Sequence, residues 1–117
     1  MTGGERFRVQ AEFCKAMAHP VRLEVIEHLR AGDLAVKELA DRIGVSQPNL
    51  SQHLAVLRAR GVVRAVRRGH GVVYGLANRK IVDACTLIRE ILTEQLVERR
   101  RAIGPTTSRR TAMPGPS

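Results

Sequence analysis

Two helix-forming stretches lie only three residues apart in the middle of the chain, and this spacing constrains the fold more than any other feature. The first stretch, residues 36–43, places apolar side chains at helical intervals and predicts a short helix. Gly44 follows it and can adopt the left-handed backbone that a tight turn requires. Ser46 predicts the N-cap of a second helix that tolerates Pro48 in its first turn and ends near Arg60. The chain therefore has two helices that must cross closely around one short turn.

The second of these helices has an apolar face and a polar face. Leu50, Leu54 and Leu57 are spaced to point inward. The outward face and its flanks then hold Pro48, Asn49, Ser51, Gln52, Ala55, Val56 and Ala59. Amides can bridge an adenine edge, hydroxyls can reach a base or a phosphate, and alanines let a helix approach the floor of a groove. A face without carboxylates suits contact with phosphates, although this helix alone would also fit an ordinary solvated surface.

The distribution of charge favours a nucleic-acid partner. The 117-residue chain has 20 Lys and Arg against 11 Asp and Glu, a formal net charge of +9. No Asp or Glu occurs between Asp41 and Asp83, whereas ordinary surfaces mix both signs. The basic residues in this gap are Arg42, Arg58, Arg60, Arg64, Arg67, Arg68, Arg79 and Lys80. Aromatic residues are limited to Phe7, Phe13 and Tyr74, which favours a duplex, because single-strand binders stack bases on aromatic rings.

Two β-forming runs follow the second helix, residues 62–68 and 72–77, and Gly69-His70-Gly71 joins them as a predicted hairpin tip. A short helix, a tight turn, a capped second helix and a hairpin are the layout of a winged helix-turn-helix. We therefore predict a mainly α fold with a small β-hairpin, in the order α-α-α-α-β-β-α. Arginines near the tip can lie on phosphates or in the minor groove. The residues predicted to contact DNA are Ser46, Gln47, Asn49, Ser51, Gln52, His53, Arg58, Arg64, Arg67, Arg68 and His70.

Further helices are predicted on both sides of this region. Residues 5–17 and 20–30 predict the first two helices, and Asn78 predicts the cap of a long last helix over residues 79–100. The apolar stripe of the last helix has near-heptad spacing. Its members are Ile81, Cys85, Ile88, Leu92 and Leu96.

The length of the chain predicts one domain with two short terminal segments. Residues 1–6 are assigned to an N-terminal extension, residues 7–100 to the winged helix-turn-helix domain, and residues 101–117 to a disordered basic tail. The polar start does not resemble a signal peptide, and no apolar run approaches the ~20 residues of a membrane span, so a soluble cytoplasmic protein is expected. Two cysteines are too few for a disulfide scaffold.

Three segments resemble the ArsR/SmtB family of bacterial repressors. They are FCKAMAHPVRLEVIEHLRAG, VKELADRIGVSQPNLSQHLAVLRARGVVRAVRRGHGVVYGLA and the helix after Asn78, and the resemblance spans residues 7–97. It implies a homodimer with the first and last helices at the interface, which represses an operator of dyad symmetry until an inducer binds. The heptad-like last helix agrees, since its stripe needs an apolar partner, although packing on its own domain would also cover it. The predicted interface residues are Phe7, Phe13, Met17, Ile81, Ile88, Leu92 and Leu96.

Many members of this family sense metals, and the sequence departs from their sites. The Cys-x-Cys thiolate site has Ala35 and Lys37 in its places, and the zinc site of the last helix needs paired histidines that this helix lacks. The four histidines, His19, His28, His53 and His70, show no ligand spacing. No metal site of these kinds is therefore expected.

Cys14 and Cys85 lie on the two helices expected at the interface, and two interpretations remain open. Both sit on apolar stripes, where a free cysteine packs well as a small hydrophobe. Alternatively, two thiols brought together could form a disulfide or polysulfide bridge, or bind a soft metal or metalloid ion such as As(III), Cd(II) or Hg(II). Thiols that ignore alkylating reagents and diamide, with DNA affinity unmoved, would exclude such a sensor.

Other classes of function fit the sequence less well. It has no Gly-rich phosphate loop, no nucleophile–base arrangement and no metal cluster, so we expect no enzyme. An RNA-binding or nonspecific nucleic-acid adaptor with the same fold and structural cysteines stays open, because basic charge alone does not exclude it. A repressor should prefer one dyad site over random DNA by several kcal/mol, and an adaptor should not.

Overall fold

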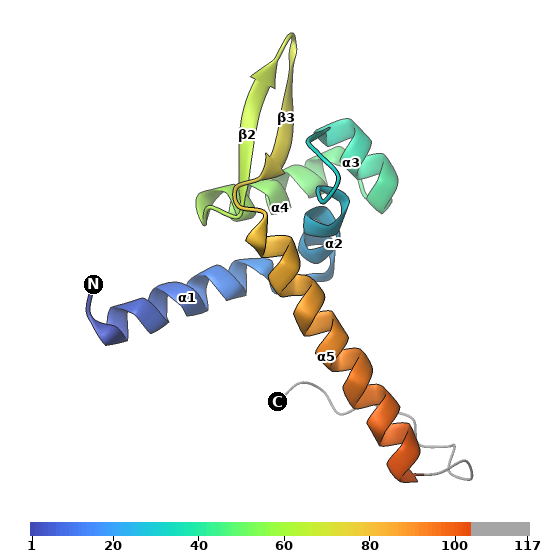
Figure 1. Ribbon diagram of the computed structural model, residues 1–117. Helices are drawn as coiled ribbons and strands as arrows, with labels where there is room; N and C mark the ends of the chain where they lie inside the picture. Colours follow the sequence, from blue (N-terminus) through green and yellow to red (C-terminus); the bar gives the residue numbers. More distant parts are fainter. Residues whose placement is uncertain (104–117) are drawn as a thin grey trace. The chain divides into compact units, whose positions relative to one another are not determined.

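The computed structural model describes residues 1–103 (Figure 1). Its elements are α1 (Gly3–Met17), α2 (Pro20–His28), β1 (Leu34–Ala35), α3 (Val36–Ile43), α4 (Gln47–Ala59), β2 (Val63–Arg68), β3 (Gly71–Leu76) and α5 (Lys80–Ile103). The chain divides into two compact units, Met1–Asp83 and a second unit that begins at Ala84 within α5. The predicted winged helix-turn-helix order is confirmed, with β1 as an addition. None of the described helices is both long enough and apolar enough to span a membrane.

Packing among α2, α3 and α4 forms the core of the first unit. Leu50, Leu54 and Leu57 of α4 are at most 1% exposed, as their spacing predicted. The same core holds Val25, Ile26, Leu29, Leu39, Ala40, Val62 and Val63. Burial of one such aliphatic side chain stabilises the fold by about 1.5–3 kcal/mol, so the three leucines determine which face of α4 is turned outward.

The turn between α3 and α4 has the predicted form. Gly44 has a φ of 87° and closes α3, with its N–H donating to the Ala40 carbonyl at 2.8 Å. A side chain at this left-handed position would be strained, because its Cβ would approach the following carbonyl. The Ser46 hydroxyl accepts a hydrogen bond from the Asn49 N–H at 3.2 Å and caps α4. The turn therefore fixes where α4 begins relative to α3.

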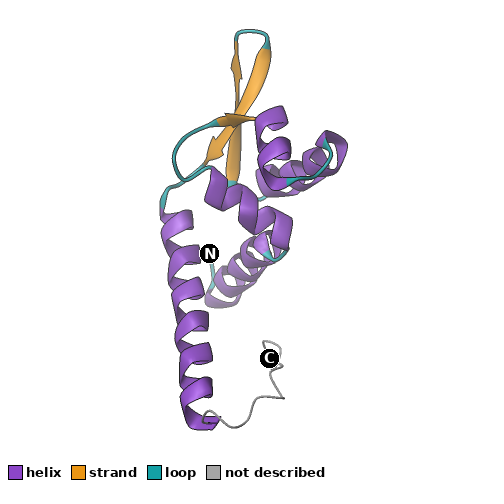
Figure 2. Cartoon of the chain, turned by 90° about the vertical axis from the view of Figure 1, so that its right-hand side faces the viewer, coloured by secondary structure: helices purple, strands orange, loops and turns teal. Residues whose placement is uncertain are grey.

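A three-stranded antiparallel sheet replaces the predicted two-stranded hairpin. The strand order is β1-β3-β2, with Leu34 opposite Tyr74 and Val63 opposite Leu76. β1 has only two residues, too few to produce a strand pattern in the sequence. Arg68 pairs with Gly71, so a two-residue turn closes the β2–β3 hairpin, which projects from the helices of the first unit (Figures 1 and 2).

The ends of the chain differ from the predicted boundaries. α1 begins at Gly3, because Thr2 and Glu5 form a capping box in which the Thr2 hydroxyl accepts from the Glu5 N–H at 3.1 Å. Residues assigned to an N-terminal extension are therefore helical. α5 is capped by Asn78, whose side-chain oxygen accepts from the Lys80 N–H at 2.9 Å, and it continues to Ile103. The rest of the predicted disordered tail, residues 104–117, lies outside the described residues.

Candidate nucleic-acid interface

The outward face of α4 presents the polar residues predicted from its spacing. Gln47, Asn49, Ser51 and Gln52 are exposed, and none of their side chains makes a hydrogen bond within residues 1–103. Ala55 and Ala59 are also exposed, and their short side chains project little from the rest of this face. A helix with free amides and hydroxyls and short neighbours can bring these groups to the edges of bases in a major groove.

His53 does not belong to this outward face. It is half-buried, and its Nδ1 accepts a hydrogen bond from Arg22 Nε of α2 at 3.0 Å. Its ring lies 4.4 Å from the ring of His19, measured between centroids. The predicted DNA contact by His53 is thus at odds with its position, which joins α4 to α2.

The neighbourhood of His53 lowers the pKa of its imidazole. Burial is the largest cause, and the charges of His19 and Arg22 act in the same direction. The Nδ1 atoms of His19 and His53 both accept hydrogen bonds, from the Val21 N–H and from Arg22, so each neutral ring carries its proton on Nε2. Neither ring therefore offers a free lone pair to a metal ion.

The lowered pKa of His53 predicts a loss of stability in mild acid. Below the ordinary value of 6.5 the unfolded imidazole takes up a proton before the folded one does, so the stability present above pH 6.5 is lost as the pH falls toward the folded pKa. We expect the melting temperature of the wild type to fall more between pH 7.5 and 5.5 than that of His53→Asn, which does not titrate. Parallel melting temperatures across this range would contradict the prediction.

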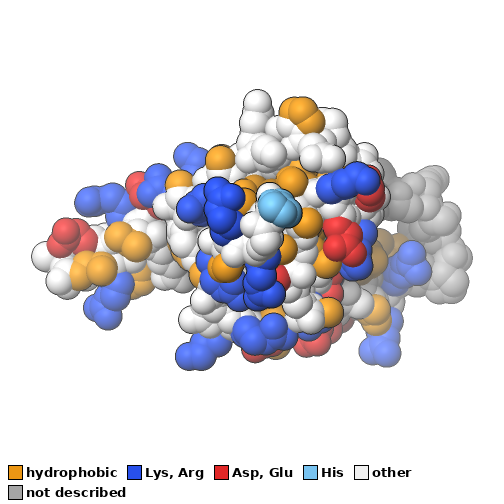
Figure 3. Space-filling model, turned by 90° about the horizontal axis from the view of Figure 1, so that it is seen from above, with side chains coloured by type: hydrophobic (Ala, Val, Ile, Leu, Met, Phe, Trp, Pro, Cys, Tyr) orange, Lys and Arg blue, Asp and Glu red, His pale blue; other side chains and the backbone are white. Residues whose placement is uncertain are grey.

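The tip of the β2–β3 hairpin is basic. Arg67, Arg68 and His70 are exposed there, and Figure 3 shows blue side chains gathered around the tip in a view from above. Arg67 and Arg68 are consecutive in β2, so their side chains leave opposite faces of the hairpin. The hairpin therefore has cationic groups on both sides of its end.

Arg64 is at the base of the hairpin and is neutralised there. Its guanidinium makes two hydrogen bonds of 3.2 Å each to the carboxylate of Asp33. Gly75 permits this pair, because a Cβ at that position would collide with the Asp33 carboxylate. Arg64 was predicted to bind DNA, but its ion pair ties the loop before β1 to the base of β2.

Several arginines of the stretch between Asp41 and Asp83 form ion pairs with Asp or Glu residues outside that stretch. Besides Arg64, Arg42 pairs with Glu38 at 3.1 Å and Arg60 pairs with Glu12 at 3.0 Å. Within the described residues, Arg58, Arg67 and Arg68 have no such partner. The end of α4 and the hairpin tip therefore hold three of the positive charges of this stretch that have no carboxylate partner among the described residues.

Among the described residues neither cysteine forms a disulfide, and the two belong to separate compact units. Cys14 is exposed on α1, and Cys85 is partly buried on α5. Among residues 1–103 no group of three or more His, Cys, Asp or Glu side chains could hold a metal ion. The role of these thiols in sensing stays a prediction.

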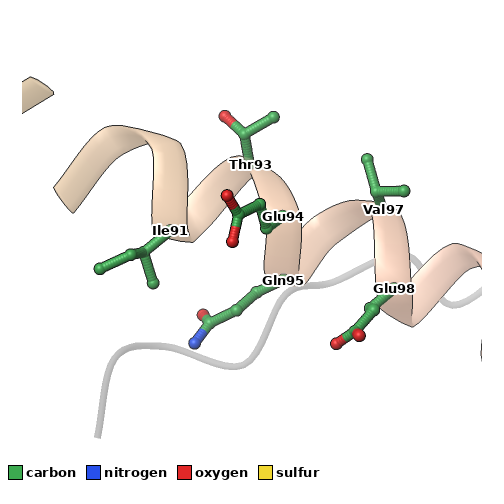
Figure 4. A pocket seen from close by; sticks show the side chains of 6 residues that line it. All are labelled: Ile91, Thr93, Glu94, Gln95, Val97 and Glu98. Atoms are coloured by element: carbon green, nitrogen blue, oxygen red, sulfur yellow. The ribbon is translucent and has the colours of Figure 1, made fainter. Parts of the chain in front are cut away.

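Among residues 1–103, the side chains that line a hollow beside α5 all come from that helix. They are Ile91, Thr93, Glu94, Gln95, Val97 and Glu98. In Figure 4 these side chains point in several directions and do not converge on one centre. Because a binding site needs convergent groups, this hollow is not assigned to a ligand.

A capped polar helix beside a basic hairpin defines a DNA-binding protein of the winged helix-turn-helix class. The helix-turn-helix domain family matches residues 17–66. An uncharacterized HTH-type transcriptional regulator of Mycobacterium tuberculosis is 38% identical over 94 residues, which cover 80% of this chain and 82% of that protein. The chain belongs to the ArsR/SmtB family of transcriptional regulators, as its resemblance indicated. This family is not a class of enzymes.

Two further relatives are named as repressors. The HTH-type transcriptional repressor SmtB of M. tuberculosis is 43% identical over 70 residues, 60% of this chain and 52% of that protein. The biofilm growth-associated repressor of Xylella fastidiosa is 36% identical over 85 residues, 73% of this chain and 75% of that protein. The similarity thus extends to relatives with named roles in transcription.

Solved structures agree with the fold. The crystal structure of M. tuberculosis Rv0081 has a TM-score of 0.73 at 38% identity and covers 80% of this chain and 94% of that one. A homodimeric winged helix-turn-helix DNA-binding domain from Mycobacterium bovis, described as a possible ArsR-family regulator, has a TM-score of 0.73 at 27% identity. This structural match covers 82% of the present chain and 94% of the M. bovis chain. These relatives favour a DNA-binding regulator over an RNA-binding adaptor.

Proposed function

We propose that this DNA-binding regulator is a homodimeric repressor that acts in the cytoplasm and places one α4 helix of each subunit in the major groove of a dyad site. The observation that carries the proposal is the exposed polar face of α4, which has no carboxylate and whose amide side chains make no hydrogen bond with the described part of the chain. Arg58, unpaired among the described residues, extends the cationic surface at the end of the same helix.

The base-reading part of the proposal rests on Asn49, Ser51 and Gln52. Their side chains project from consecutive turns at the N-terminal half of α4, and Leu50 and Leu54 hold this half against the core. An amide can bond two atoms of an adenine edge at once, which is worth about 1–3 kcal/mol against a wrong base. Gln52 is the strongest candidate because it lies opposite the buried leucines.

The hairpin supplies contacts that do not depend on sequence. Arg67 and Arg68 leave opposite faces near the tip, so a hairpin laid along the duplex could reach phosphates on both sides of a minor groove. Such contacts raise affinity and salt dependence more than base preference.

Dimer formation is supported by apolar side chains that the single chain leaves exposed. Phe7 of α1 is 71% exposed, and Leu87, Ile88 and Ile91 of α5 are 59%, 57% and 51% exposed. A row of this kind on one helix is typical of an interface and costs free energy in water. The homodimeric relative from M. bovis has the same fold.

The proposed interface differs in part from the residues predicted by periodicity. Ile81 is only 8% exposed and belongs to the core of its own chain, so it is removed from the interface. Phe13 and Met17 are half-buried on α1. Leu92 and Leu96, at 47% and 39% exposure, remain in the proposed interface.

The test selects bound fragments from genomic DNA and then measures base preference in the selected site. Gln52→Ala should relax preference at one base pair in each half-site, reducing the discrimination by about 1–3 kcal/mol. The matched control is Gln95→Ala, since Gln95 lies on α5 and has no proposed base contact. Equal binding of the wild type to all duplexes, or a preference for RNA, would contradict the proposed function.

An inducer is proposed to weaken DNA binding by this regulator. Cys14 and Cys85 stay as candidate thiol sensors, with a soft metal or metalloid ion as one candidate signal. The exposed Cys14 is the more accessible of the two to a reagent in solution.

A further inference from the structure

The guanidinium of Arg22 joins three helices of the first unit. Arg22 is half-buried on α2. Its Nη1 donates to the Ala16 carbonyl in the last turn of α1 at 3.1 Å, and its Nε donates to His53 Nδ1 of α4 at 3.0 Å. One guanidinium group therefore connects the end of α1 to the middle of the DNA-reading helix.

Each of these bonds uses an atom that has few other partners. The last carbonyls of a helix have no partner within the helix, and Ala16 lies in the last turn of α1. A neutral imidazole has one acceptor nitrogen, and in His53 that nitrogen is Nδ1, which accepts from Arg22. The guanidinium directs its N–H groups in a fixed planar fork, so the two bonds together fix the direction of α4 relative to α1.

A second contact joins the same two helices. Glu12 of α1 and Arg60, the C-cap of α4, form an ion pair at 3.0 Å. Both side chains are about half-exposed, at 52% for Arg60 and 48% for Glu12, so this pair adds little stability alone. It does place a second α1–α4 contact at a different point along α4.

We propose that Arg22, through His53, is a positioning residue that sets the angle between α1 and the DNA-reading helix, and so the half-site spacing that the dimer accepts. The inference rests on the proposed function, in which α1 lies at the dimer interface and α4 in the groove. In a two-fold dimer, the angle between these two helices determines the distance between the two α4 helices. That distance must match the separation of successive major grooves.

Conservative variants separate this role from simple packing. Arg22→Lys keeps the charge but cannot direct two N–H groups along the same fork. His53→Leu keeps the bulk and removes the acceptor, whereas His53→Asn keeps an acceptor near the position of Nδ1. His53→Asn is therefore the matched control for His53→Leu.

The experiment uses the full chain and its selected dyad site, together with versions whose half-sites are one base pair closer or farther apart, and a single half-site. We expect Arg22→Lys and His53→Leu to reduce the preference for the native spacing by about tenfold, the scale of coupling through a packed network. Affinity for the single half-site should stay unchanged, and His53→Asn should keep the native preference. Melting temperatures identify any variant that does not fold, in which case the two His53 variants decide the outcome.

The outcomes separate the two ideas. If the wild type prefers the native spacing and folded Arg22→Lys and His53→Leu keep that preference, the positioning role is wrong and the proposed function stands. If the wild type does not distinguish the dyad from a single half-site, both are overturned. A loss of half-site affinity equal to the loss on the dyad would show that Arg22 acts within one subunit and not on spacing.

Discussion

Ile88→Glu with Leu92→Glu is expected to convert the dimer into a monomer and to weaken binding to the dyad site by at least about hundredfold, the usual gain from two linked contacts. Ile88 and Leu92 are 57% and 47% exposed in the single chain, and they are neighbours on one face of α5. Two-fold symmetry would bring the introduced carboxylates into an apolar interface, where they are costly to desolvate. Sedimentation gives the subunit number and a binding titration gives the affinity.

The control for this experiment is Val97→Glu. Val97 is 47% exposed on α5, and at 3.6 residues per turn it lies on the opposite side of the helix from Ile88. This variant should remain a dimer with unchanged affinity. If it dissociates while the Ile88 and Leu92 variant does not, the interface lies on the other face of α5.

The fold was predictable from sequence where local signals agreed with one another. The periodic leucines of α4, the turn at Gly44 and the cap at Ser46 each predicted the same helix-turn-helix, and the structure confirms it. Local signals are strong here because each depends on residues three or four apart. The start of α1 was also available in the sequence, since Thr2 and Glu5 have the spacing of a capping box.

The spacing of His53 in the sequence already indicated a position toward the core, although the residue was predicted to contact DNA. Residue 53 follows Leu50 by three and precedes Leu57 by four, so helical spacing places it toward the core. Its polarity suggested a DNA contact, but a half-buried imidazole can be satisfied by a partner such as Arg22. That partner lies 31 residues away in sequence, and no local pattern indicates it.

Long-range ion pairs account for the rest of what the sequence did not reveal. Asp33 and Arg64 are 31 residues apart and meet only because β1, β2 and β3 form one sheet. Glu12 and Arg60 meet because α1 contacts α4. A stretch free of acids in sequence can therefore be partly neutralised in space, and the cations that remain unpaired among residues 1–103 are better candidates for phosphate contacts.

Replacing both hairpin arginines, Arg67→Ala with Arg68→Ala, is expected to weaken binding to every duplex alike. Each lost phosphate contact should reduce the slope of log affinity against log salt by about 0.9, so the slope should fall by about 1.8. The same relation gives a loss of about 60-fold at 0.1 M salt. Base preference should be unchanged, because the hairpin is proposed to contact phosphates only. Titrations of selected and random DNA over a range of salt concentrations measure both quantities.

Arg64→Gln is the matched control because it removes an arginine from the same strand. The charge of Arg64 is already balanced by Asp33 through two bonds of 3.2 Å, so its removal should change the salt slope far less than loss of either tip arginine. An equal fall in slope for Arg64→Gln would mean that DNA displaces Asp33 and recruits the base of the hairpin. An unchanged slope in the double variant would mean that the hairpin tip does not reach phosphates, and the charge that holds this regulator on DNA would then have to come from elsewhere in the chain.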